Sequence, residues 1–414
     1  MWHSWWRKIL LKAASKVSVV AKRPEAELLL CCARTRIDSE KVSRISELLR
    51  QEMNWAYLLR MARAHRITPL LFWHLNAASP EAVPEDVLEQ LRNHFHNGNL
   101  RSLVLTGELL KLLGLFETYE IPAIPYKGPA LATFAYGNLA LREFDDLDIL
   151  IHKQDVPRAK ELLISVGYQP QYYLNRAQEV TFLRYGFELG FTRVGGEGAV
   201  DLHWELAEKH FSFSLDPRSL WGRLERVPLG GGSVPTLMPE DLLLVLCAHG
   251  SKHLWQRLMW ICDVAELVRV SDGMDWVRVV ERAATLGSER MLFLGLYLAS
   301  DLLGMALPVE IAQRIQDDTA VKMLAGQVRE RLFRGANGSP AVFEELPFHS
   351  FHIKVRERLR DKIQYCLRAA TATTVRDWML LPLPRYLYPL YYLIRPFRMI
   401  GKYGPRLVKR LFYN

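Results

Sequence analysis

The chain has 414 residues, half of them hydrophobic, a length that allows two or three domains with sizeable cores. Five cysteines without a Cys-x-x-Cys pair exclude a disulfide-rich secreted scaffold, and no apolar run approaches the roughly 18 residues of a membrane-spanning helix. The net charge of +9 is concentrated at the ends: residues 1–24 carry six Lys or Arg and no acid, residues 350–414 carry a net +11, and residues 25–349 are left with −8. Such ends around a mildly acidic body predict an anionic partner, either lipid headgroups or nucleic acid.

Residues 1–24 form the first predicted segment, a basic amphipathic helix. The apolar residues of its stripe are Trp2, Trp5, Trp6, Ile9, Leu10, Ala13 and Val17. This pattern is typical of a helix at a membrane surface, and packing on the body or contact between subunits is the alternative. The start lacks the continuous apolar core of a signal peptide, so we expect a cytoplasmic protein, with peripheral contact at the inner face of the membrane as one outcome.

Residues 25–118 are predicted to be helical. Apolar residues recur at helical spacing through residues 39–67, where Ser39 is the expected N-cap, and again through residues 99–121.

The pattern changes in residues 119–236. Residues 121–137 predict a short strand, a Lys-Gly turn and a helix, and residues 145–152 predict a buried strand. A helix follows from Asp155 to Gly167, and two hairpins follow it, one over residues 180–206 and one over residues 226–237. Strands alternating with helices in this way predict an α/β fold, or α+β in a stricter scheme, with a small mixed sheet.

Residues 237–340 are predicted to be helical again. Pro239 and two acids open the first helix, which we expect to be broken near Gly250. Residues 341–414 form a basic segment rich in aromatic residues and proline, which suits a headgroup interface, and no nucleic-acid-binding motif is recognised in the chain. We therefore expect five parts with the boundaries 1–24, 25–118, 119–236, 237–340 and 341–414.

Three acids carry the chemistry that we expect. Asp146 and Asp148 are two apart in a predicted strand, so they share a face, and Asp201 opens the second strand of the first hairpin. Paired carboxylates repel one another, and a hard divalent cation such as Mg²⁺ between them removes that cost. A solvated acid at the start of a strand is the common structural alternative for either aspartate alone.

Two further motifs flank these acids. Lys127 and Gly128 form a turn at a helix N-terminus, which can hold phosphate through backbone N–H groups and charge. In the stretch His-Gly-Ser-Lys-His, His249 and His253 share a helix face near Lys252. The histidines are either hydrogen-bonded inside a helical domain or lie with Lys252 on the substrate side of a cleft.

The stretches 125–151, 200–206 and 249–267 resemble the bacterial uncharacterised nucleotidyltransferase family, part of the polymerase-β-like superfamily, and the resemblance extends over about residues 25–340. It implies a nucleotidyltransferase core in residues 119–236, with Asp146 and Asp148 as the metal-binding pair and Asp201 as the third acid. It also places Lys127 and Gly128 on the turn of the family and Arg142 on an arginine that precedes the D-x-D strand.

Two functions follow from the resemblance and the residues together. The first is an enzyme that binds a nucleoside triphosphate with Mg²⁺ and transfers a nucleotidyl group to an unknown hydroxyl acceptor. The three acids would hold the metals, and Lys127, Gly128, Arg142 and Lys252 would bind the nucleotide. The second is a non-catalytic nucleotide- or partner-binding protein in a membrane-associated assembly such as surface polysaccharide synthesis. Pro129 after the turn glycine favours the second function, and the three acids favour the first.

Overall fold

The computed structural model describes residues 23–78, 80–193, 195, 198–208, 211, 213, 215–333, 350–371, 387 and 390–391. The predicted N-terminal amphipathic helix and most of the basic C-terminal segment lie outside these residues, so their membrane contact stays a prediction. Within the described part, every helix is too short or too polar to cross a membrane.

The centre of the molecule is a five-stranded mixed sheet. Its strands are β1 (Ala123–Pro125), β2 (Asp146–Ile151), β3 (Tyr168–Pro170), β4 (Glu188–Arg193) and β5 (Ala199–His203). They are arranged in the order β1-β2-β5-β4-β3. The pair β2–β5 is parallel, whereas the other neighbours are antiparallel. A separate hairpin consists of β6 (Leu224–Leu229) and β7 (Gly232–Leu237).

The two faces of the sheet differ in character because side chains alternate along each strand. On β2, Leu147, Ile149 and Ile151 belong to a core that also contains residues of two helices behind the sheet. These helices are α6 (Glu85–Thr118) and α8 (Val156–Ser165). The alternate residues Asp146 and Asp148 face the other way. This alternation explains how a strand that starts with carboxylates can still be buried.

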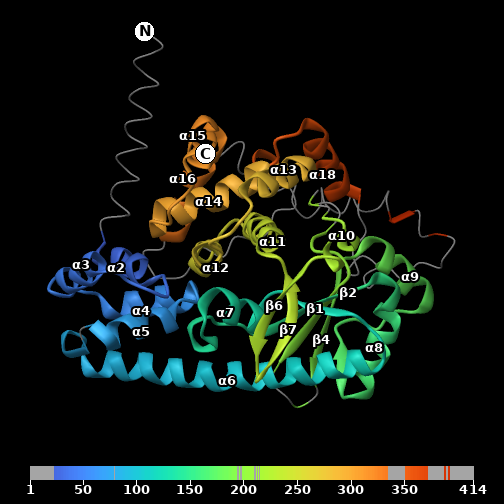
Figure 1. The fold of residues 1–414 in the computed structure, drawn as a ribbon, viewed down its shortest axis with the longest axis horizontal. Coiled ribbons are helices and arrows are strands. Elements are labelled where there is room, and N and C mark those ends of the chain that lie inside the picture. Colours follow the sequence, from blue (N-terminus) through green and yellow to red (C-terminus); the bar gives the residue numbers. More distant parts are fainter. Residues whose placement is uncertain are drawn as a thin grey trace, which may run out of the picture.

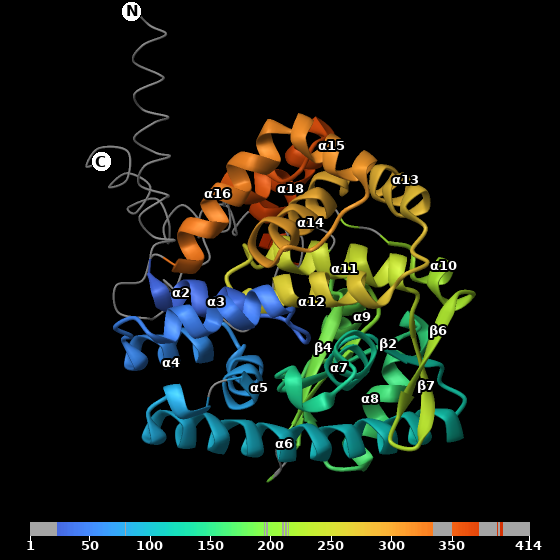
Figure 2. The same cartoon turned by 60° about the vertical axis from the view of Figure 1, so that its left-hand side comes forward.

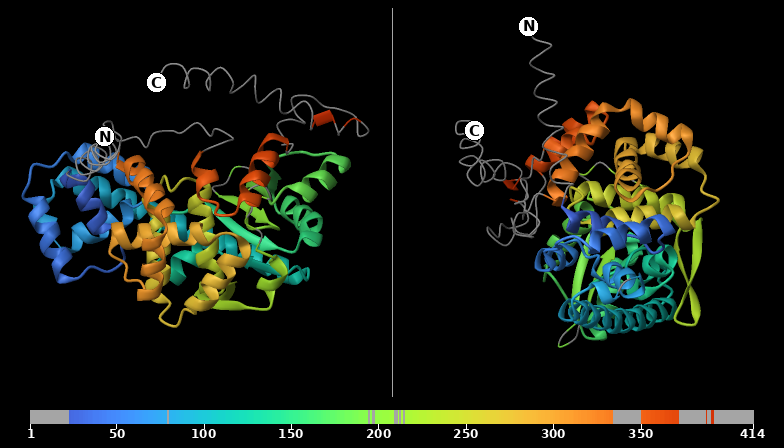
Figure 3. Two further views of the ribbon diagram at one scale, coloured as in Figure 1. Left: turned by 90° about the horizontal axis from the view of Figure 1, so that it is seen from above. Right: turned by 90° about the vertical axis from the view of Figure 1, so that its left-hand side faces the viewer.

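The helix α6 is long enough to join two regions. Figure 1 shows it along the base of the molecule, beneath both the N-terminal helices and the sheet. The N-terminal helices are α2 (Pro24–Cys32), α3 (Ser39–Leu49), α4 (Trp55–Ala64) and α5 (Thr68–Ala78). Seen from above, they lie at the opposite end of the molecule from α9 (Arg176–Tyr185) (Figure 3).

The C-terminal helices cover the remaining side. α12 (Leu258–Val270) lies next to α7 (Gly128–Tyr136) and packs against α11 (Pro239–Lys252), and further helices stack outside them (Figure 2). The outer helices are α13 (Trp276–Leu286), α14 (Glu289–Leu303), α15 (Val309–Asp317), α16 (Thr319–Phe333), α17 (Ser350–Lys354) and α18 (Leu359–Thr371). The short α10 (Pro217–Trp221) precedes β6. One continuous core joins the N-terminal helices, α7 and the C-terminal helices.

The predicted fold class is confirmed: a small mixed sheet is flanked by helices on both sides in sequence. Two local predictions were wrong. The N-cap of α3 is Asp38, whose carboxylate accepts a hydrogen bond from the Lys41 amide, so Ser39 is already helical. Residues 180–185 belong to α9, which an Asn175–Gln178 capping box starts. The predicted break near Gly250 is confirmed, because α11 ends at Lys252 and α12 begins at Leu258.

Candidate active site

The strand register brings the three predicted acids to one face of the sheet. Asp148 on β2 is the direct partner of Asp201 on the parallel strand β5, and Asp146 pairs with Ala199. Partners on adjacent strands point to the same side, so all three carboxylates face away from α6 and α8. On β4, Gly190 is paired with Asp201, and a Cβ at this glycine would come within 3.2 Å of the carboxylate. The missing side chain therefore leaves room for Asp201.

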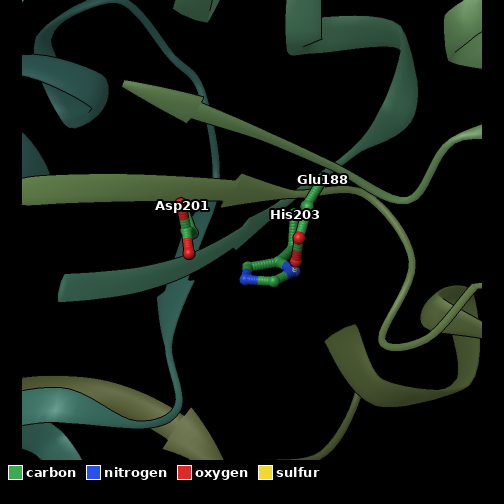
Figure 4. A group of neighbouring side chains, drawn as sticks. All are labelled: Glu188, Asp201 and His203. Carbon is green, nitrogen blue, oxygen red and sulfur yellow. Dashed lines mark ion pairs between the residues drawn. The ribbon is translucent and has the colours of Figure 1, made fainter. Parts of the chain in front are cut away.

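Two residues that were not predicted lie beside Asp201. His203 follows it by two positions on β5, and Glu188 is the partner of His203 on β4. Figure 4 shows Asp201 and His203 on the same side of β5, with Glu188 next to the imidazole. Ligand atoms of these three side chains all lie within 4.8 Å of one another. Glu188, Asp201 and His203 thus form a group that could hold a metal ion.

The imidazole of His203 has an unsatisfied nitrogen in this group. Its Nε2 lies 3.1 Å from Asp148 Oδ1 and donates a hydrogen bond to it. Its Nδ1 faces Glu188 Oε2 at 3.4 Å without a hydrogen bond, although the side chain is buried. When Nδ1 carries no proton, its lone pair is directed at the Glu188 carboxylate, which is unfavourable. A cation between the two removes this repulsion.

The predicted Lys-Gly turn lies at the N-terminus of α7. Gly128 has φ +53°, in the left-handed region, and a Cβ there would lie 3.2 Å from the Asp146 carbonyl oxygen. Both facts favour glycine at this position. Pro129 lies in the first turn of α7, where a proline is well tolerated because its missing N–H has no helical partner. It also removes one N–H that could face a phosphate.

The side chain of Lys127 contacts the acids directly. Its Nζ lies 2.7 Å from Asp148 Oδ1, and both side chains are largely buried. Burial alone would raise the pKa of the Asp148 carboxyl, but the Lys127 ammonium and the His203 hydrogen bond hold that pKa well below its usual range. The pKa of Lys127 is raised by the same pair, against the effect of burial. Asp148 is therefore ionised and already partly neutralised.

The other two acids are in the opposite electrostatic situation. Burial, followed by the charge of Asp148, raises the pKa of Asp146. Burial also raises the pKa of Asp201 to about 6, and the nearby carboxylates of Asp148 and Glu188 add to this effect. Ionised Asp146 and Asp201 therefore lack sufficient positive charge around them. A divalent cation would supply it.

Replacement of Asp201 should change how the stability of the metal-free protein depends on pH. The folded-state pKa of about 6 lies above the ordinary value of about 3.9. The protonated Asp201 carboxyl therefore contributes to the free energy of unfolding below about pH 4, and this contribution is lost as the pH rises through 6. Between pH 5 and 7.5, we expect Asp201→Asn to gain about 1 kcal/mol of unfolding free energy relative to the wild type, after allowance for partial exposure. Urea unfolding in EDTA measures this difference.

The exposed Asp272 provides the control. The difference in unfolding free energy between Asp272→Asn and the wild type should be the same at pH 5 and at pH 7.5. If this difference does not change with pH for Asp201→Asn, the ionised Asp201 carboxylate does not destabilise the metal-free protein.

Arg142 lies at the edge of the same cavity but is held by a helix. Its Nε and Nη2 donate to the two oxygens of Asp263 on α12, at 2.7 and 2.9 Å. The Tyr136 hydroxyl donates to Asp263 Oδ1 at 2.7 Å. Arg142 and Asp263 are 5% and 1% exposed, so this bidentate pair is buried. The predicted contact of Arg142 with phosphate is not tested by this arrangement and stays a prediction.

The helical domain forms the wall opposite the acids. His249, Lys252 and His253 of α11 and its C-cap line a cavity of about 400 Å³, together with the three aspartates, Lys127 and Gly128. The two imidazoles lie 4.7 Å apart and contact Trp260. Burial lowers the pKa of His249 well below its ordinary value and that of His253 to about 3, so both are neutral at pH 7. Lys252 lies 4.5 Å from the centre of the Phe187 ring.

The rule that predicted the site at Asp146 and Asp148, that residues two apart in a strand share a face, also applies to Glu188 and His203. In Asp201-Leu202-His203 and in Glu188-Leu189-Gly190, polar or small residues alternate with apolar ones. Alternation predicts that His203 shares a face with Asp201. The pairing of Glu188 with His203 depends on the hairpin register, which the sequence leaves undetermined over several glycines.

A family model described as an uncharacterised nucleotidyltransferase matches residues 51–304, which include β1 to β7, α11 and α12. No curated protein matches the chain.

Proposed function

The chain belongs to the uncharacterised nucleotidyltransferase family, and we propose that it transfers a nucleotidyl group from a nucleoside triphosphate to a hydroxyl acceptor in the presence of Mg²⁺. Membership makes it an enzyme of the transferase class, for which a nucleotide is the substrate. One observation carries the finer proposal: Asp146, Asp148 and Asp201 face one cavity beside the Gly128 turn.

The residues present fit a divalent cation. Asp146 and Asp201 have raised pKa values, and the buried Nδ1 of His203 lacks a hydrogen-bond partner. We assign the metal to Asp146, Asp148 and Asp201, with Glu188 and His203 as additional ligands beside Asp201. When bound, metal ions in such a site neutralise the charge that develops on the attacking and leaving oxygens.

The reaction forms one P–O bond and breaks another. The acceptor hydroxyl oxygen attacks the α-phosphorus, and the bond from that phosphorus to the pyrophosphate oxygen breaks, so pyrophosphate leaves. The hydroxyl proton goes to a base, and we assign this role to the Asp201 carboxylate because it lines the same cavity as Asp146 and Asp148. Lys127, Arg142 and Lys252 offset the phosphate charge, and the turn at Gly128 holds phosphate through its backbone N–H groups.

Lys127 connects the metal and the nucleotide in this proposal. Its ammonium contacts Asp148 Oδ1 at 2.7 Å, where a metal ligand is needed. A cation at Asp148 would repel the ammonium, which can then turn to the triphosphate. Nucleotide binding should therefore depend on Mg²⁺ for two reasons: the charge of the metal itself and the release of Lys127.

Isothermal calorimetry with a panel of nucleoside triphosphates tests the proposal. At least one nucleotide should bind in Mg²⁺ and bind much more weakly in EDTA. Lys127→Ala should weaken binding in Mg²⁺ by about ten- to a hundred-fold, because it removes a charge-assisted contact worth about 1.5–3 kcal/mol.

The exposed Lys111, on α6 behind the sheet, offers the matched control, since Lys111→Ala should leave the affinity unchanged. If no nucleotide binds under either condition, the proposed function is wrong. If nucleotide binds without any release of pyrophosphate, a non-catalytic binding role is the better assignment.

A further inference from the structure

The cavity carries more positive groups than the sequence predicted. Five cationic side chains other than histidine line it, and four of these have an acidic partner in the structure. The pairs are Lys127 with Asp148, Arg142 with Asp263, Arg66 with Asp145, and Lys252 with Glu208. The fifth is Arg257, and it differs from the others.

Among the described residues, the Arg257 side chain makes no ion pair and no hydrogen bond. Its guanidinium carbon lies 5.5 Å from the centre of the Trp260 ring. Its side chain is only partly exposed. An arginine has five N–H donors in a planar fork, and such a fork in a cavity normally meets a carboxylate or a phosphate.

The backbone before Arg257 is held in an unusual conformation. Leu254 and Trp255 have φ values of +58° and +52°, in the left-handed region that residues other than glycine rarely adopt. Trp255 is fully buried, and a Cβ at Gly250 or Gly295 would come within 2.6 or 3.1 Å of its ring. The two glycines thus make space for the tryptophan that anchors this turn. Strain of this kind persists where the surrounding structure fixes it, often at binding sites.

The charges around Arg257 also point to an anion. Burial, and next the charge of Arg66, lowers the pKa of Arg257, whereas Asp145, Asp146 and Glu143 act in the opposite direction. Arg257 therefore lies near a second arginine and close to Asp146 of the acidic group. Two arginines near one another repel, and Arg66 is already bound to Asp145. An anionic group in the cavity would stabilise the free guanidinium.

We propose that Arg257 binds a phosphate group of the substrate from the helical wall, opposite Asp146, Asp148 and Asp201. This inference rests on the proposed function for the identity of the substrate, but the phosphate contact itself does not. The phosphate belongs either to the nucleoside triphosphate or to a phosphorylated acceptor. In both cases Arg257 provides positive charge on the side of the cavity that the sheet does not reach.

Calorimetry on the full-length protein tests the inference, with inorganic tripolyphosphate and the panel of nucleoside triphosphates as probes, each in Mg²⁺ and in EDTA. Arg257→Gln should weaken tripolyphosphate binding by about ten- to a hundred-fold. Arg257→Lys should recover only part of the loss, because lysine keeps the charge but not the fork. The exposed Arg278→Gln on α13 removes the same charge outside the cavity and should bind like the wild type. Thermal unfolding should be similar in all variants, since Arg257 makes no ion pair to lose.

The outcomes separate the two proposals. Equal tripolyphosphate affinity in the wild type and in Arg257→Gln overturns the role of Arg257, whether or not nucleotide binds. Tripolyphosphate binding that depends on Arg257, without binding of any nucleoside triphosphate, supports this role and overturns the nucleotide proposal. Absence of binding to both probes overturns both. Where both probes bind, competition between them assigns Arg257 to the nucleotide, and simultaneous binding assigns it to the acceptor.

Discussion

Asp146→Asn and Asp148→Asn should each lower the rate of Mg²⁺-dependent nucleotidyl transfer by about a thousand-fold or more. A bound metal stabilises transition-state charge by several kcal/mol, and each 1.4 kcal/mol is a factor of ten in rate. An amide in place of either carboxylate removes a negatively charged ligand from the site. Release of pyrophosphate measures the rate whatever the acceptor is.

The same two variants should differ in stability. The pKa of Asp146 is raised by burial and by Asp148, so loss of the Asp146 charge should leave the metal-free protein equally stable or more stable. Asp148 is the partner of the largely buried Lys127, and Asp148→Asn leaves that ammonium without its counter-ion. Loss of one partner of a buried pair costs about 3 kcal/mol or more. In urea unfolding with EDTA, Asp146→Asn should therefore have a higher free energy of unfolding than Asp148→Asn.

Asp155→Asn is a suitable control for both measurements, because Asp155 lies at the far end of β2, outside the cavity. It should keep the activity of the wild type. Full activity in Asp146→Asn or Asp148→Asn would show that these acids do not hold the metal. Equal stability of the two variants would show that Lys127 does not depend on Asp148.

The acidic face of the sheet could be predicted because it follows from a local rule. Side chains two apart in a strand share a face, and this places Asp146 with Asp148 whatever the rest of the fold does. The alternate apolar residues Leu147, Ile149 and Ile151 belong to the core behind the sheet. Only the position of Asp201 needed more than one strand, and the predicted hairpin supplied it.

The partners of the acids could not be predicted in this way. Lys127 was expected at phosphate, and its contact with Asp148 depends on the packing of α7 against β2. Asp263 is 121 positions after Arg142, and nothing in the local pattern of either residue indicates their contact. Long-range ion pairs depend on how complete elements pack, whereas hydrophobic periodicity reports only which face of an element is buried.

The turn between α11 and α12 shows a second limit of sequence reasoning. The break that was expected near Gly250 lies two residues further on, after Lys252, and its conformation was not predicted. In the structure Gly250 stays helical because the Trp255 ring packs against it, and the left-handed residues are Leu254 and Trp255. Neither residue type suggests a turn, so Arg257 received no role in the sequence analysis. Tertiary packing of one tryptophan here overrides local preference.

Loss of either partner of the buried pair Arg142–Asp263 should lower the free energy of unfolding more than loss of a partner in a surface ion pair. Asp263→Leu leaves a guanidinium that is 5% exposed without its bidentate partner, and it removes the acceptor of the Tyr136 hydroxyl. We expect a loss of about 3–5 kcal/mol in the free energy of unfolding, and a similar loss for Arg142→Met. The double variant should be more stable than Asp263→Leu, because two apolar side chains replace the charges together. Denaturant unfolding of the four proteins gives the coupling energy.

The surface pair of Arg44 and Glu27, with side chains 41% and 38% exposed, provides the matched control. Arg44→Met and Glu27→Leu should each cost about 0–1 kcal/mol and show little coupling. Additive losses at Arg142 and Asp263 would contradict the structural role of their pair.

The double variant also separates structure from binding, because Arg142 uses Nε and Nη2 for Asp263 and leaves Nη1 for another acceptor. If the folded double variant binds nucleotide as the wild type does, Arg142 acts only through α12; if it binds more weakly, the guanidinium also serves the phosphate.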